Sequence, residues 1–262
     1  MKKLSTSLCL LMLCSPVWAN SGAALTNSEI SQVLTHIDRP KADLARDAAR
    51  HPDKILAFSG VAKGDTVLDL FAGGGWYSEL FAHAVGAKGK VYLQNDEVIW
   101  RFAEQDAIAR TANNRLPNVI RLDKIAIADI DVPAGSVDIA FMALNYHDLF
   151  FTQMIRDGKT VVLREQVVDY RAALATIKSA LNDDGVLIII DHFGAPGSGY
   201  EAPNSVHRID PAIVKYQLEQ AGFSLAEEAM YLRNAQDDYS KSVFDPSVRG
   251  NTDRFVYKFV KK

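Results

Sequence analysis

The sequence predicts an α/β protein built on one mostly parallel, doubly wound sheet. Short, nearly continuous apolar runs alternate with amphipathic segments, and a run of three glycines follows the first apolar run. The composition fits a folded domain, because 48% of the 262 residues are hydrophobic and 23% are charged, which excludes disordered and collagen-like chains. The formal net charge of −3 offers no cationic surface for a polyanion, so we expect no nucleic-acid partner.

The first residues have the features of a signal peptide. Two lysines and an apolar run precede small residues at Val17 and Ala19, which predicts a signal peptide over 1–19 with cleavage near Ala19. The run is too short to span a bilayer, so we expect no stable membrane insertion after cleavage and an exported protein, periplasmic or secreted. Cys9 and Cys14 both lie in this segment, so the mature chain is expected to have no disulfide. The alternative is a buried N-terminal helix.

Residues 20–60 are predicted to form a helical N-terminal extension. Helical patterns cover 28–34, 41–50 and 53–58, and Arg39-Pro40 separates the first two. We expect these helices to pack over the entrance to one larger domain, residues 61–262, because no internal repeat or linker divides the rest of the chain.

Seven strands are expected in that domain. Nearly solid apolar strands that alternate with amphipathic helices are typical of a parallel sheet covered on both faces. The last two strands follow a helix directly and are joined by a long polar loop, which predicts an antiparallel pair at one edge. The predicted strands cover 66–71, 90–93, 118–122, 137–144, 186–191, 224–232 and 254–260, and the helices between them include 98–110 and 210–221.

The strongest motif is Val67–Ser78 (VLDLFAGGGWYS). It places Asp69 near the end of a strand and three glycines, Gly73 to Gly75, in the turn before a helix. Glycines there let the backbone approach a ligand, and the helix N-terminus offers free N–H donors. Ser78 stands where the dinucleotide fingerprint has its third glycine, which disfavours a nicotinamide oxidoreductase. A tight strand–helix turn without a ligand is the alternative.

On these residues the chain resembles class I S-adenosylmethionine-dependent methyltransferases, whose first motif is an acid followed by a glycine turn. More narrowly, it resembles a group of exported predicted methyltransferases that combine a signal peptide with GGGWY, NYHD, DH and TDRF segments, all present here. The resemblance runs from about residue 61 to the C-terminus. It implies a Rossmann-like, seven-stranded fold and S-adenosyl-L-methionine as the cofactor.

The resemblance also implies roles for single residues. The glycine turn would lie under the methionine part of the cofactor, Asp69 would orient the turn or bind the amino group, and Asp129 would bind adenine. Asn95 occupies the slot of the acid that holds the ribose, with Asp96 next to it. This is a departure from the family, because an Asn accepts only through its carbonyl oxygen. The cofactor-binding residues so implied are Asp69, Phe71, Ala72, Gly73, Gly74, Gly75, Asn95, Asp96, Asp129 and Asn145.

The ends of the fourth and fifth predicted strands carry the candidate catalytic residues, Tyr146, His147, Asp148 and His192. By the same resemblance, the segment from Asn145 to Asp148 would face the transferred methyl group. His147 is a candidate general base, because an imidazole titrates near neutral pH. His207 follows a glycine-rich stretch and is expected at the same mouth. The alternative for each histidine is a cap on a strand or a hydrogen bond to a loop.

Three functions remain open at this point. The first is an exported methyltransferase acting on a small or medium-sized acceptor molecule. An exported enzyme needs a supply of a cofactor made in the cytosol, which motivates a second hypothesis, a non-catalytic module that binds an adenosyl ligand. The third is a metal-dependent hydrolase that uses the His and Asp residues, disfavoured because no His-x-x-x-His spacing is present, so no residue is assigned to a metal. The polar loop before the last strand forms either a lid or acceptor pocket, or a solvated edge.

Overall fold

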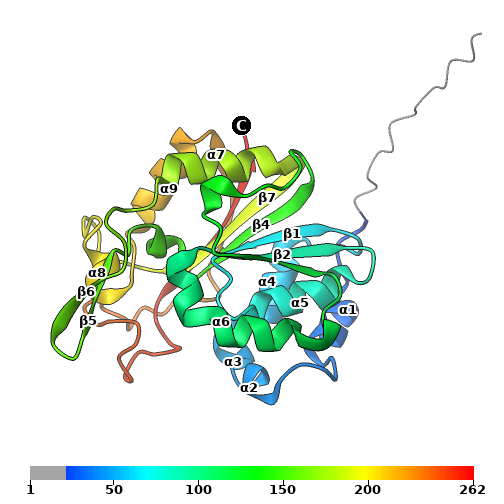
Figure 1. Ribbon diagram of the computed structural model, residues 1–262, viewed down its shortest axis with the longest axis horizontal. Coiled ribbons are helices and arrows are strands. Elements are labelled where there is room, and N and C mark those ends of the chain that lie inside the picture. The colour runs from blue at the N-terminus through cyan, green and yellow to red at the C-terminus, as the bar shows by residue number, and fades with distance from the viewer. Residues whose placement is uncertain (1–21) are drawn as a thin grey trace, which may run out of the picture.

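The computed structural model describes residues 22–262, so the predicted signal peptide at 1–19 lies outside the described residues. One seven-stranded sheet has the order β3-β2-β1-β4-β7-β9-β8, and β9 runs antiparallel to the other six strands (Figure 1). The predicted Rossmann-like fold is confirmed. The strands are β1 Thr66–Leu70, β2 Lys90–Asn95, β3 Val119–Asp123, β4 Val137–Ala143, β7 Leu181–His192, β8 Phe223–Ala229 and β9 Arg254–Lys261.

Both faces of the sheet are covered, because alternate side chains of each apolar strand enter two different cores. Leu68 of β1 packs with Leu174 in the core under α7 and α9, whereas Val67 packs with Leu80 in the core under α1, α4 and α5. Figure 1 shows α7 and α9 on one side of the sheet and α4 and α5 on the other. The helices are α1 Asn27–Leu34, α4 Pro52–Ser59, α5 Trp76–Val85, α6 Glu97–Thr111, α7 Tyr170–Ala180, α8 Ala202–Val206 and α9 Pro211–Gln220.

The helical extension differs in one place from its prediction. Residues 41–50, expected as one helix, form two short helices, α2 Lys41–Leu44 and α3 Asp47–Arg50. The chain turns between them because Asp47 folds back to Arg39, whose guanidinium donates to the Asp47 carboxylate at 2.8 and 2.9 Å. The extension is tied to the domain by Trp76, which donates to the Asp43 carbonyl at 3.2 Å. No helix within residues 22–262 is both long and apolar enough to cross a membrane.

A small hairpin was not predicted from the sequence. Its strands, β5 Gln153–Arg156 and β6 Lys159–Val162, pair with each other and lie apart from the main sheet (Figure 1). The turn between them is Asp157-Gly158, and both residues have positive φ (52° and 72°). Asp-Gly is a strong signal for such two-residue hairpin turns, so the sequence contained the evidence for it.

Candidate functional site

A cavity of about 1300 Å³ opens at the carboxyl ends of β1, β4 and β7. This is the edge at which open α/β sheets bind ligands. The cavity is larger than the roughly 300–1,000 Å³ of typical ligand pockets, so it has room for two small molecules side by side. Its walls come from the glycine turn, from α2, α3 and α6, and from the loop before β9.

Three residues in the cavity wall have strained backbones. Phe71 (φ 49°) follows β1, Leu144 (φ 62°) follows β4, and His207 (φ 54°) ends α8. Positive φ in such residues costs on the order of 1–3 kcal/mol and persists only where the surroundings enforce it. Asn145 supplies part of that enforcement, because its Nδ2 donates to the carbonyls of Leu70 and Phe71, both at 2.9 Å.

The other amide atom of Asn145 is free to bind a ligand. The side chain is buried and lines the cavity, and its Oδ1 has no hydrogen-bond partner among residues 22–262. A buried acceptor without a partner is costly, so a donor from a ligand would remove a penalty of about 1–3 kcal/mol. Asn145 therefore marks a point at which a bound N–H group fits.

The three glycines of the turn have different roles. A Cβ at Gly73 (φ 58°) would meet nothing within 4 Å, so this residue leaves the cavity open. A Cβ at Gly74 would lie 2.6 Å from the Asp106 Cβ of α6, and one at Gly75 would lie 2.6 Å from Leu93 Cδ1 of β2. Gly73 and Gly74 line the cavity, whereas Gly75 does not. Packing therefore requires the second and third glycines, and the ligand site requires the first.

Asp69 is a buried carboxylate in the same wall. It is 2% exposed and accepts a hydrogen bond from Ser78 Oγ at 2.6 Å. Burial raises the pKa of this carboxyl to about 7, an effect that the Ser78 hydrogen bonds only partly offset. No lysine or arginine of the described chain is bonded to it, so a positively charged ligand group would stabilise its ionised form.

The ribose slot is organised differently from the expectation. Asn95 is fully buried, and its amide pairs with the main chain of Gly73: Oδ1 accepts from Gly73 N at 2.8 Å and Nδ2 donates to Gly73 O at 3.0 Å. Asp96 caps α6 through Val98 N and Ile99 N, and its second oxygen accepts from Arg164 at 2.7 Å. Both side chains thus hold the protein together instead of facing the cavity.

Two more predicted residues lie away from the cavity lining. Asp129 is exposed at the end of the 3-10 turn Ile127–Asp129. Tyr146 is fully buried in the core, where its hydroxyl donates to Gln217 Oε1 at 2.7 Å. The binding role of Asp129 and the catalytic role of Tyr146 stay predictions without a geometric basis in the cavity. The predicted residues that do line it are Asp69, Phe71, Ala72, Gly73, Gly74, Asn145, His147, Asp148 and His192.

The expected convergence of three histidines is confirmed. The ring of His147 lies 6.1 Å from that of His192 and 5.4 Å from that of His207, measured between centroids. His147 Nδ1 lies 2.9 and 3.1 Å from the two carboxylate oxygens of Asp191, and its Nε2 faces Nδ1 of His207 at 3.3 Å and Oδ1 of Asp148 at 3.5 Å.

The three imidazoles differ in charge. Burial lowers the pKa of His147, but the carboxylates of Asp191 and Asp148 outweigh it and raise the pKa to about 9. Burial and the charge of His147 lower the pKa of His207 to about 3 and hold the pKa of His192 well below its ordinary value. An imidazolium has no free lone pair, so this arrangement argues against His147 as a general base at neutral pH.

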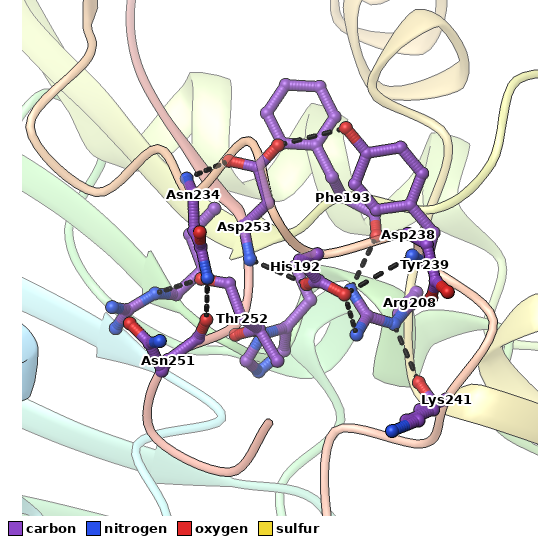
Figure 2. A network of polar contacts seen from close by, with 12 residues as sticks. His192, Phe193, Arg208, Asn234, Asp238, Tyr239, Lys241, Asn251, Thr252 and Asp253 are labelled. Atoms are coloured by element: carbon purple, nitrogen blue, oxygen red, sulfur yellow. Dashed lines mark hydrogen bonds and ion pairs between the residues drawn. The ribbon is translucent and has the colours of Figure 1, made fainter. Parts of the chain in front are cut away.

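Residues of the polar loop between β8 and β9 line the cavity. Of the two alternatives for this loop, the structure therefore favours a pocket wall over a solvated edge. Its anchor is a fully buried ion pair, in which Arg208 donates to both carboxylate oxygens of Asp237 at 2.9 and 3.0 Å. The Asp253 main-chain N–H donates to Asp237 at 2.7 Å, and the Asp253 carboxylate accepts from Tyr239 at 3.0 Å (Figure 2). The anchored loop places Thr252 Oγ1 2.7 Å from His192 Nδ1.

Several arginines that sequence reasoning did not select also line the cavity, among them Arg254 and Arg50. Arg254 is only 7% exposed, and the single hydrogen bond of its side chain within the described chain runs from Nε to the Thr252 carbonyl at 3.3 Å. Arg50 ends α3, and its guanidinium lies 4.8 Å from the ring centroid of Trp76. Burial lowers the pKa of both guanidinium groups. The only sequence signal for Arg254 is its place in the TDRF segment, and Arg50 had none.

The comparisons with known proteins identify the fold. No protein-family model and no curated sequence matches the chain. A solved S-adenosylmethionine-dependent methyltransferase from Aquifex aeolicus is 24% identical, with a TM-score of 0.55 over 90% of this chain and 99% of that one. Another from Mesorhizobium loti is 13% identical, with a TM-score of 0.53 over 82% and 99%. The chain therefore has the fold of class I S-adenosylmethionine-dependent methyltransferases.

Proposed function

We propose that the protein is an exported S-adenosylmethionine-dependent methyltransferase that acts on a small or medium-sized acceptor. The observation that carries the proposal is Asn145 Oδ1, which has no hydrogen-bond partner in the described part of the chain and shares one wall of the cavity with the buried carboxylate of Asp69 and the open turn at Gly73. S-adenosylmethionine carries an ammonium and a sulfonium group, so a wall with a carboxylate and a free acceptor suits it. The cofactor supplies a methyl group that is already activated.

The chain's own residues then have mainly to bind, orient and exclude water. We call the wall formed by Asp69, Gly73 and Asn145 the cofactor side. His147, His192, His207, Thr252 and Arg254 also line the cavity, and we call this group the acceptor side. The guanidinium of Arg254 fits an anionic group of the acceptor, and Thr252 fixes the ring of His192.

The alternative of a non-catalytic adenosyl-binding module loses one of its two supports. That hypothesis was motivated by the supply of a cytosolic cofactor to an exported protein, and the Asn95 departure fitted it as a sign of weakened ribose binding. Asn95 instead braces Gly73 on both its N–H and its carbonyl. The departure is therefore explained by the structure of the turn, and it says nothing against turnover. Export remains part of the proposal, and sequencing the N-terminus of the secreted protein tests it.

Titration calorimetry of the purified full chain tests the cofactor. We expect saturable binding of S-adenosylmethionine and S-adenosylhomocysteine, and none of NAD. Absence of binding by the first two would overturn the proposed function, because the glycine turn would then have only a structural role.

A pair of glycine variants ties that binding to the site. Gly73→Leu fills open space on the cofactor side and should weaken S-adenosylmethionine binding by about 100-fold or more. Gly135→Leu is the matched control, because Gly135 has a similar φ (67° against 58°), also has open space at Cβ and does not line the cavity. Both variants lose roughly 1–2 kcal/mol of stability to the left-handed backbone. Equal cofactor affinity in the two variants would contradict the assignment.

A further inference from the structure

We propose that His147, Asp148 and His207 bind one divalent transition-metal ion, for which zinc is the best fit, on the acceptor side of the cavity. His147 Nε2, His207 Nδ1 and a carboxylate oxygen of Asp148 all lie within 4.8 Å of one another. Two atoms bonded to zinc at about 2.0–2.1 Å, at a tetrahedral angle, are separated by about 3.3 Å. The two measured separations from His147 Nε2, 3.3 and 3.5 Å, match that spacing.

The orientation of His147 is set by a carboxylate behind it. Asp191 is fully buried and is itself held in place, because it accepts from the main-chain N–H groups of His147 at 2.8 Å and His192 at 2.7 Å. A bound metal ion would take the place of the Nε2 proton, which is released to solvent, while the bond to Asp191 keeps the remaining hydrogen on Nδ1, so that the lone pair is on Nε2, the atom that faces His207 and Asp148. Metal-binding histidines almost always have such a partner on the second ring nitrogen.

The donor set indicates which kind of ion fits. Two imidazole nitrogens favour zinc, copper, nickel or iron over magnesium and calcium, which prefer oxygen ligands. Three protein ligands leave a coordination position open, as in catalytic zinc sites and unlike closed structural ones. Asp148 and Asp191 together balance the charge of a dication, so the group formed by the two histidines, the two carboxylates and the ion would be neutral.

The placement of the three residues favours binding of a ligand by the ion. All three line the cavity, so an ion can enter and its open position would face a bound molecule. The backbone of His207 is strained (φ 54°). Its ring packs against the rings of Phe151 and Phe244, with centroid separations of 4.3 and 4.8 Å, and these contacts fix its orientation. The inferred site uses three of the His and Asp residues for which the sequence left metal binding as a disfavoured alternative, and it does not depend on the proposed methyl transfer.

Calorimetric titration of the chelator-treated full chain with zinc chloride tests the site. Cys9→Ser and Cys14→Ser form the background, because thiolates also bind zinc. We expect one ion per chain, and about 100-fold weaker binding in the His147→Gln/His207→Gln variant. The matched control is His36→Gln/His83→Gln, a second pair of close imidazoles (3.8 Å between centroids) that does not line the cavity, and it should bind zinc unchanged. Asp191→Asn should weaken binding by about 10–100-fold.

Several results would overturn the inference. The first is the absence of saturable zinc binding, and the second is zinc binding of unchanged affinity in the His147→Gln/His207→Gln variant. The third is magnesium binding as tight as that of zinc, if the same double change abolishes it. If the double variant loses its native circular dichroism, His207→Gln alone replaces it with the same expectation. Titrations with zinc and with S-adenosylmethionine are separate, so zinc binding without cofactor binding would overturn only the proposed function, and the reverse only the metal site.

Discussion

The two sides of the cavity are built by different means. The cofactor side uses residues at the ends of β1 and β4, held by hydrogen bonds between neutral amides and main-chain atoms, such as Asn145 to Leu70 and Asn95 to Gly73. The acceptor side draws on separate segments that follow β4, β7, α8 and β8, and buried charges fix them.

The difference shows in what each side can tolerate. A neutral hydrogen bond contributes about 0.5–1.5 kcal/mol, whereas removal of one partner from a buried ion pair costs about 3–5 kcal/mol. The acceptor side should therefore be the more fragile of the two under substitution, although its loop lies at the molecular surface.

The largest effect is expected at Arg208. Arg208→Met leaves the fully buried Asp237 carboxylate without its cationic partner, and should lower the free energy of unfolding by about 3–5 kcal/mol. Arg208→Met/Asp237→Asn should recover part of that loss, because the isolated charge is gone while an acceptor for the Asp253 N–H remains. Urea unfolding followed by circular dichroism gives both values.

A partly exposed ion pair provides the control for that result. Lys258 donates to Glu227 at 2.7 Å, and Glu227 is half-exposed, so Lys258→Met should cost less than about 1 kcal/mol. A loss at Arg208 no larger than the loss at Lys258 would show that buried charge does not hold the acceptor side.

Most of the fold was predictable because its signals are local. The apolar runs of β1, β4 and β7 are visible in the sequence itself. The antiparallel final pair was predicted from the helix that precedes it and from the long polar loop that joins its two strands. The exceptions were segments that depend on distant contacts. Residues 41–50 break into two helices because Asp47 turns back to Arg39, and no periodicity within the segment predicts that ion pair.

The site divides along the same line. The turn at Gly73 and the carboxylate of Asp69 were predicted because neighbouring residues define them. The roles of Asn95 and Asp96 were not, since a side chain's partner decides whether it faces a ligand or braces the backbone. Arg254 on the acceptor side was likewise missed, because its burial depends on how the loop from β8 folds.

A pH-dependent effect sharpens the role of Asp69 on the cofactor side. Its folded pKa of about 7 lies above its ordinary value of 3.8, so the folded state retains a proton that the unfolded state loses. The extra proton of the folded state therefore lowers the free energy of unfolding as the pH rises. The contribution of Asp69 is fully present below pH 3.8 and falls by up to about 4 kcal/mol as the pH approaches 7. Asp69→Asn removes it, so the variant should gain stability relative to the wild type as pH rises through that range.

Urea unfolding of both proteins from pH 4 to 8 measures that difference. Calorimetry gives a second reading, because a cationic cofactor binds best to the ionised carboxylate. Wild-type affinity for S-adenosylmethionine should rise with pH up to about 7, and the Asp69→Asn profile should be flatter. Parallel stability curves for the two proteins would mean that Asp69 does not titrate in this range.

The smallest effect, at Asn95, separates a brace from a ribose ligand. Asn95→Asp restores the acid of the family pattern but places a carboxylate oxygen against the Gly73 carbonyl, where the amide now donates at 3.0 Å. A ribose-binding role predicts tighter binding of S-adenosylmethionine by this variant. A bracing role predicts weaker binding and a loss of about 2 kcal/mol in stability. Asn118→Asp is the control, because Asn118 also donates to two carbonyls, at 2.9 and 3.0 Å, but does not line the cavity. Both variants should lose stability. Only Asn95→Asp should lose cofactor affinity, because Asn95 braces Gly73 of the cofactor side, whereas the carbonyls bonded to Asn118 lie outside it.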